Sequence, residues 1–111
     1  MPRGVDVEIL DGFYDYEGEV DGKPYTGLVS IQKKVDIYVV RFFTGADGYV
    51  GVGMRHGELF VVGWSSHEAR GVTAFSVKPG PSLSGSWTSL PGDGRKHSEK
   101  LDFIKPFKKQ E

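Results

Sequence analysis

The residues best suited to catalysis or metal binding in this 111-residue chain are three histidines and the polar run Ser65–Arg70. Two imidazoles share a metal ion most readily when they lie two or four residues apart, and His56, His67 and His97 are not spaced that way. The run holds a hydroxyl, an imidazole and a carboxylate, but a catalytic triad is assembled in space, and neighbours in one turn rarely converge. We therefore expect no enzyme, no metal site and no cofactor. The alternative for the run is a polar rim in which Arg70 binds an anion.

A glycine-rich run, Gly51–Gly57, resembles a phosphate-binding loop only at first sight. It lacks the Lys-Ser or Lys-Thr ending of a P-loop, and the residues on both sides of it have strand character. No helix N-terminus would therefore face a phosphate. Glycine in a strand favours a sharp bend, so we interpret the run as a site of strand curvature.

Aromatic side chains and one arginine are the candidates for binding rather than catalysis. Trp and Tyr occur both in protein cores and at recognition sites, so Tyr38, Trp64 and Trp87 either fill an interior or line it. Arg41 stands among apolar residues. Its side chain either extends to a rim or is a buried charge that needs an acidic group from a ligand or a neighbour.

Composition narrows the function classes. The chain has no cysteine, which excludes disulfides and thiolate chemistry, and its net charge of −1 argues against a general nucleic-acid binder. No segment approaches the roughly 20 apolar residues of a membrane helix. We expect a cytoplasmic protein without nucleic-acid or membrane partners, and a secretion signal that has been removed is the alternative.

Charge is distributed unevenly along the chain. Residues 1–22 carry one cation against seven anions, whereas residues 91–111 carry six cations against four anions. If the first and last strands are neighbours, these biases become cross-strand pairs. The alternative is that the basic tail Lys105–Lys109 docks on an acidic partner or a membrane.

Short apolar runs separated by Gly- or Pro-containing turns indicate an antiparallel meander rather than alternating strands and helices. Side chains within the runs alternate with the period of two that a half-buried sheet requires. Asp11-Gly12 is predicted to be a two-residue hairpin turn. The predicted strands number eight, or nine with the N-terminal one: Val5–Leu10, Phe13–Val20, Tyr25–Lys33, Val35–Phe43, Tyr49–Arg55, Glu58–Ser65, Gly71–Lys78, Leu83–Thr88 and Ser98–Ile104.

Two of these runs are apolar on both faces. In Ile37–Phe43 and Leu59–Trp64 apolar residues occupy nearly every position, so both sides of these strands must be covered. In a closed barrel one face fills the interior, and the other then needs a partner surface. We therefore expect a homo-oligomer.

Several segments resemble small bacterial β proteins of unknown function, a family with no known activity: Tyr16–Val20, Asp36–Val40, Gly51–Met54, Glu58–Trp64 and Leu83–Thr88. The meander with Gly85–Trp87 is also similar in architecture to the avidin and lipocalin group of eight-stranded barrels. Avidins place a comparable Gly-x-Trp in their first strand, whereas here it lies near the end. The resemblance therefore implies a fold and no ligand.

These observations predict a single all-β domain over residues 1–111, an up-and-down barrel of about eight strands with little helix. The interior of such a barrel is either packed solid or holds one small ligand. We expect a non-enzymatic binding module for a small apolar or amphipathic ligand at an aromatic-lined barrel mouth. The alternative is a domain that associates with itself through apolar outer strand faces. The predicted ligand-binding residues are Tyr38, Arg41, Trp64, Arg70 and Trp87.

Overall fold

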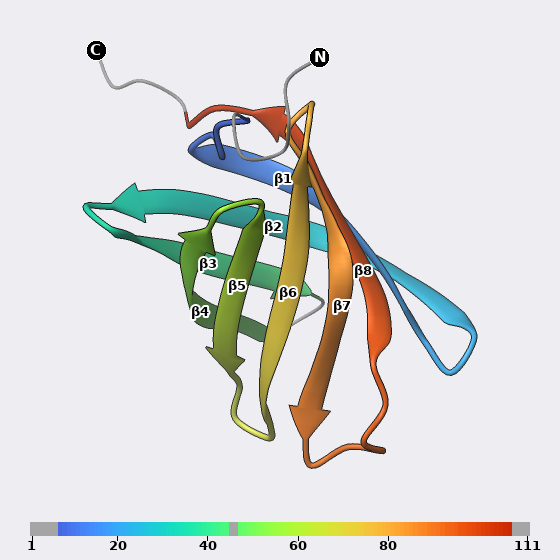
Figure 1. Cartoon of the computed structure of the whole chain (residues 1–111). Coiled ribbons are helices and arrows are strands. Elements are labelled where there is room, and N and C mark those ends of the chain that lie inside the picture. Colours follow the sequence, from blue (N-terminus) through green and yellow to red (C-terminus); the bar gives the residue numbers. More distant parts are fainter. Residues whose placement is uncertain (1–6, 45–46, 108–111) are drawn as a thin grey trace.

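The computed structural model describes residues 7–44 and 47–107, and its eight antiparallel strands close into one barrel (Figure 1). Each strand pairs with the next along the chain, and β1 also pairs with β8. The all-β, eight-stranded prediction is confirmed. The strands are β1 (Gly12–Val20), β2 (Lys23–Lys34), β3 (Ile37–Thr44), β4 (Asp47–His56), β5 (Leu59–Ser65), β6 (Arg70–Lys78), β7 (Ser82–Leu90) and β8 (His97–Lys105).

The predicted N-terminal strand is wrong over the residues that the structure describes. Residues 7–11 form no strand, and Val5 and Asp6 lie outside the described residues. Both edges of β1 are already occupied, by β2 and β8, so no ladder is left for a ninth strand to join. Ile9 instead inserts into the core with 3% of its surface exposed. The alternation in this segment therefore reflects one anchored apolar side chain.

The turn between β2 and β3 corrects a second boundary. Val35 was expected to start a strand, but it lies in the turn with a φ of 59° and is 87% exposed. That backbone region is unfavourable for a β-branched residue. The ladder between β2 and β3 extends to the pair Lys34–Ile37, so only two residues remain to reverse the chain. Hairpin geometry has overridden the preference of valine for strands.

The closure of the barrel brings the acidic and basic parts of the chain together, as the charge distribution suggested. In the ladder between β1 and β8, Glu17 lies opposite Lys100, but Asp15 lies opposite Asp102. Lys100 is near Asp102 on its own strand, with 3.4 Å between Nζ and Oδ2. The terminal strands therefore carry mixed charge pairs. Lys108 and Lys109 of the predicted basic tail lie outside the described residues.

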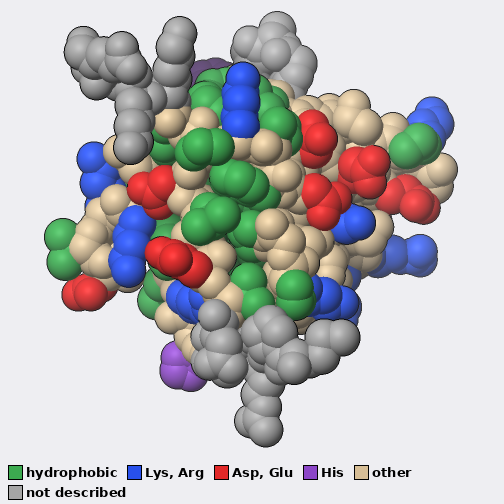
Figure 2. Space-filling model, turned by 90° about the horizontal axis from the view of Figure 1, so that it is seen from above, with side chains coloured by type: hydrophobic (Ala, Val, Ile, Leu, Met, Phe, Trp, Pro, Cys, Tyr) green, Lys and Arg blue, Asp and Glu red, His purple; other side chains and the backbone are tan. Residues whose placement is uncertain are grey.

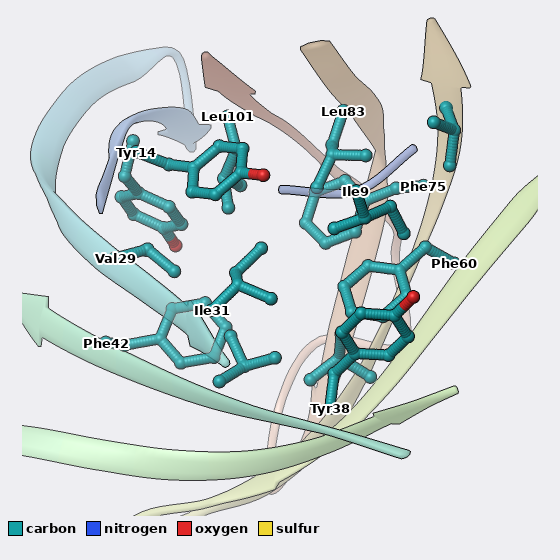
Figure 3. Packing of buried hydrophobic residues seen from close by; sticks show 14 residues of the cluster. Ile9, Tyr14, Val29, Ile31, Tyr38, Phe42, Phe60, Phe75, Leu83 and Leu101 are labelled. Carbon is teal, nitrogen blue, oxygen red and sulfur yellow. The ribbon is translucent and has the colours of Figure 1, made fainter. Parts of the chain in front are cut away.

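The core occupies the end of the barrel at which β1 begins and β8 ends, called the closed end here. Buried hydrophobic side chains from every strand except β4 make up this core, and Ile9 lies among them (Figure 3). Ring pairs pack at about 5 to 6 Å, including Tyr38 with Phe60 at 5.1 Å and an interplanar angle of 82°. The Tyr14 hydroxyl donates to the Leu10 carbonyl over 2.7 Å. The N-terminal segment thus seals this end and satisfies a buried polar group.

Glycines on the inner face make room for large rings on neighbouring strands. A Cβ at Gly71 would lie 2.2 Å from the ring of Trp64, and one at Gly18 would lie 2.2 Å from the ring of Tyr25. Gly71 is opposite Trp64 in the ladder, and Gly18 is opposite Tyr25. These positions therefore need glycine for close approach of an aromatic ring.

The outer face of the sheet over β4, β5 and β6 is apolar. Val52 lies beside Gly63, which lies beside Val72, so the apolar side chains on this face are neighbours. Hydrophobic side chains also gather in the middle of the surface seen from above, with charged side chains around them (Figure 2). The exposed apolar side chains on the outer face of β4, β5 and β6, called the outer apolar face below, are Val50, Val52, Met54, Leu59 and Val72.

Candidate ligand-binding site

The opposite end of the barrel, where β1, β5 and β7 finish, is hollow and is called the open end here. A cavity of about 400 Å³ lies between the strands at this end. Its size is in the range of small-molecule sites, which are mostly apolar with a few polar groups. The residues that line this aromatic cavity are Tyr16, Val20, Tyr25, Thr26, Tyr49, Trp64, Trp87 and Glu99.

Aromatic rings follow one another around the inside of the barrel at this level. Tyr49 stacks on Phe42 at 4.5 Å and lies 5.0 Å from Trp64, which is 6.1 Å from Trp87. Tyr16 lies 5.2 Å from Tyr25 and continues the series. Because the rings come from different strands and pack on one another, the cavity wall is held in place by contacts among its own side chains.

Hydrogen bonds orient several of these rings. The Trp64 indole Nε1 donates to Thr73 Oγ1 over 3.1 Å, and the hydroxyls of Tyr16 and Tyr25 form a hydrogen bond with 3.1 Å between their oxygens. Burial raises the pKa of Tyr49 to about 12 and also raises the pKa values of Tyr16 and Tyr25. The tyrosines are therefore neutral hydroxyls at physiological pH.

Glu99 is the acidic group of the aromatic cavity. It lies between Gly18 of β1 and Gly85 of β7 in the ladders, and only 4% of its surface is exposed. Burial raises the pKa of its carboxyl from 4.5 to about 7, and hydrogen bonds with the Tyr16 and Thr73 hydroxyls oppose the shift. Its Oε2 atom is buried without a hydrogen-bond partner among the described residues. The cavity thus contains a carboxyl with unused bonding capacity.

Trp87 supplies a second buried polar atom, its indole Nε1, whose contact with the Tyr25 hydroxyl acts to lower the pKa of that tyrosine but falls short of full hydrogen-bond geometry. Its ring lies 4.7 Å from the ring of His97, whose Nε2 is 3.4 Å from Asp93 Oδ1. The pKa of Asp93 is lowered, chiefly by the hydrogen bond it accepts from the Arg95 backbone N–H. Buried donors and acceptors normally have partners, so the unpartnered Glu99 Oε2 atom leaves bonding capacity at this wall.

No protein-family model matches this sequence, and no curated protein matches it.

The structure brings together some of the five residues predicted from the sequence. Trp64 and Trp87 line the aromatic cavity, and Arg70 is exposed at the start of β6, on the rim of the open end. Tyr38 is 7% exposed and packs in the core of the closed end. Arg41 is exposed between the inward side chains of Val40 and Phe42, so it points outward. Tyr38 and Arg41 are thus separated from the two tryptophans.

The polar run Ser65–Arg70 spans the turn between β5 and β6, in which Ser65 ends β5, Arg70 begins β6 and the four residues between them connect the strands. The Ser66 N–H donates to the Ala69 carbonyl over 2.7 Å, and the Ala69 N–H donates to Ser66 Oγ over 3.2 Å. The Ser66 hydroxyl is therefore used to close the turn, and His67 is exposed. Across residues 7–44 and 47–107 no group of three or more His, Asp and Glu side chains could hold a metal ion.

Sequence reasoning did not single out Glu99, Tyr25 or Tyr49 as candidates for the site. A signal for Glu99 was present, because it lies two residues before Leu101, and alternation in β8 places both side chains inside the barrel. The choice of Tyr25 and Tyr49 depended on which strand ends meet at the open end. That information lies in the ladders between strands and not in the pattern within one strand.

Proposed function

We propose that this protein is a non-enzymatic binding module that takes a small apolar or amphipathic molecule into the aromatic cavity. The single observation that carries the proposal is a cavity of about 400 Å³ walled by tyrosine and tryptophan rings. Such a wall contributes apolar contact and ring stacking without a large loss of side-chain entropy. The avidin and lipocalin likeness is proposed at the level of architecture only, and no ligand is inferred from it.

The contrast between the two ends of the barrel supports this proposal. Core side chains such as Phe60 and Leu83 are fully buried at the closed end, whereas the aromatic cavity lies at the open end. At the open end the Glu99 Oε2 atom is unpartnered within the described residues, and burial of such an atom costs free energy unless a ligand or water bonds it. A ligand with both apolar surface and polar groups fits this combination.

Native mass spectrometry of protein purified from its own host is the direct test. A co-purifying mass that disappears on denaturation supports a binding barrel and gives the ligand's mass. Trp87→Ala should then abolish retention of that molecule while the β circular-dichroism signal persists. Arg41→Ala is the matched control, because its exposed outward side chain should leave retention unchanged. Barrels that are empty in every preparation, with no molecule that binds on addition, would contradict the proposal.

A second candidate is self-association through the outer apolar face, which would make the protein a homo-oligomer. The observation in its favour is the row of exposed apolar side chains, with Val52 57% and Met54 60% exposed. Contiguous apolar patches on a protein surface commonly mark interaction sites. Sedimentation equilibrium should give a mass above that of one chain, and Val52→Lys should return it to that of one chain. A monomer at all concentrations would rule this candidate out.

A further inference from the structure

Glu99 is a buried carboxyl that borders a cavity and has bonding capacity left over. It is 4% exposed, and its Oε2 has no hydrogen-bond partner in the part of the chain that is described. The hydroxyls that it does contact, from Tyr16 and Thr73, are held in place by Tyr25 and Trp64 respectively. A carboxylate of this kind is costly to bury unless an opposite charge pairs with it. The structure therefore provides half of an ion pair.

The walls of the cavity around the Glu99 carboxyl also favour a positively charged ligand. Five of the residues that line the aromatic cavity carry aromatic rings, and none of the described lining residues is Lys or Arg. The face of an aromatic ring is electron-rich and attracts a cation within about 6 Å of its centre, most strongly where water is excluded. The walls and the carboxyl thus both favour a positively charged ligand.

We propose that the aromatic cavity binds a small organic ammonium ion, whose N–H groups donate to the Glu99 carboxylate while Tyr and Trp rings enclose its hydrocarbon part. This inference rests on the proposed function and names the ligand class of that site. A neutral molecule would lack the electrostatic attraction that ring faces exert on a cation. An organic anion would be repelled by both the Glu99 carboxylate and the electron-rich ring faces.

Binding of a cation must be coupled to the proton of Glu99. Because burial raises the pKa of this carboxyl to about 7, the group is partly protonated at neutral pH, and an ammonium ion displaces that proton. Other titratable groups line the cavity or lie beside its wall on the neighbouring strands: Tyr16 on β1, Tyr25 on β2, Tyr49 on β4 and His97 on β8. An adjoining hollow of about 450 Å³ is bordered by the charged side chains of Glu17, Glu19 and Lys100. The tyrosines stay neutral, so Glu99 and His97 are the groups to separate experimentally.

Three probes of similar size test the charge preference: 2-phenylethylammonium, 2-phenylethanol and 3-phenylpropanoate. The chain has two tryptophans and both line the aromatic cavity, so intrinsic fluorescence excited at the tryptophan band reports binding. We expect the ammonium probe to bind at least about tenfold more tightly than the other two, because only its ammonium group forms a charge-assisted hydrogen bond with the buried Glu99 carboxylate. Its affinity should fall about tenfold between pH 7 and pH 5.5, and calorimetry in two buffers should show release of a proton near pH 6.5.

Glu99→Gln removes the charge and keeps the shape. In this variant the three probes should bind alike, and the pH dependence should disappear. The matched control is Glu17→Gln, which removes the same charge from an exposed position on β1 next to the ladder pair of Gly18 and Glu99. It should retain the preference for the ammonium probe. If Glu99→Gln does not fold, the preference of the wild-type protein for the ammonium probe over 2-phenylethanol and 3-phenylpropanoate still tests the inference.

The outcomes separate this inference from the proposed function. If 2-phenylethanol or 3-phenylpropanoate binds as well as the ammonium probe, the cavity binds small molecules but the ammonium inference is wrong. If Glu17→Gln loses the preference as Glu99→Gln does, the cation sits in the adjoining hollow and the inference is wrong. If Glu99→Gln keeps the pH dependence, a group other than Glu99 is responsible and the inference is again wrong. If no probe binds, the inference fails, and native mass spectrometry then decides whether the proposed function fails as well.

Discussion

The closed end and the open end of this barrel use the same kinds of residue in opposite ways. At the closed end the aromatic side chains of Tyr14 and Phe60 are fully buried, and the Tyr14 hydroxyl donates to the Leu10 carbonyl. At the open end Trp64 and Trp87 are only partly buried, and Glu99 has an oxygen with no partner within the described residues. Tyr14 and Phe60 at the closed end are fully buried and the Tyr14 hydroxyl is hydrogen-bonded, whereas the cavity wall at the open end has a carboxyl oxygen without a hydrogen-bond partner among the described residues.

This difference shows how a small barrel can pack one end tightly and leave the other end hollow. Eight strands enclose a space just large enough for side chains to fill, so a hollow forms only where the inward side chains do not extend into that space. Here stacked rings hold one another at the wall, and Glu99 remains as an uncompensated polar group. Departures from complete packing and polar satisfaction are expected at functional sites, and stability must come from elsewhere in the fold.

The largest effect should come from breaking the closed end. Phe60→Ala removes a side chain with 0% exposure, and we expect the free energy of unfolding to fall by about 3–5 kcal/mol in urea denaturation. Trp87→Ala at the open end should cost clearly less, because its partly buried ring faces a space that is already hollow. Equal losses at the two positions would contradict the comparison.

The pH dependence of stability tests the open end. The pKa of Glu99 is raised from 4.5 to about 7 in the folded state, so its contribution is fully present below pH 4.5 and is lost as pH rises to about 7. The expected loss is about 3 kcal/mol. Urea denaturation of the wild type and Glu99→Gln across this range isolates the effect, because other groups cancel in the difference. A constant difference between the two proteins would show that Glu99 is not desolvated.

The seal at the closed end should have a smaller effect. Ile9→Ala should lower the free energy of unfolding by about 2–3 kcal/mol, because Ile9 is 3% exposed within the core although it belongs to no strand. Thermal or urea unfolding measures the change. Leu10→Ala is the control, since Leu10 is 37% exposed and should cost less than about 1 kcal/mol. If Ile9→Ala is as mild as its neighbour, the N-terminal segment does not seal the barrel.

The smallest expected effect concerns single hydroxyls. Tyr14→Phe should cost about 1 kcal/mol, because it leaves the Leu10 carbonyl without its donor at the closed end. Tyr25→Phe at the open end should cost less than half as much, because its hydroxyl lies at a cavity that water can enter. Denaturation of both variants under identical conditions makes the comparison. A larger loss for Tyr25→Phe would mean that the hydroxyl pair with Tyr16 is structural.

Much of the fold could be predicted from local patterns, and the site only in part. Alternation located all eight strands to within a few residues, but it also suggested a strand at Val5–Leu10, because one anchored side chain such as Ile9 imitates the pattern. Trp64 and Trp87 were placed in the candidate site by residue type. Tyr38 shares that type but lies at the closed end, since residue type says nothing about which end of a strand a residue occupies.

The class of fold follows from the chain's own alternation, turn residues and scarcity of helix-forming patterns, because each of these acts within a few neighbouring residues. The same local patterns show that Glu99 and Leu101 share one face of β8. The tertiary structure determined the rest. The pairing of β8 with β1 and with β7 placed Glu99 between two glycines, and the N-terminal segment packed into one end of the barrel while the other end stayed hollow. Register and closure are set by contacts between residues far apart in the chain, and no local pattern encodes them.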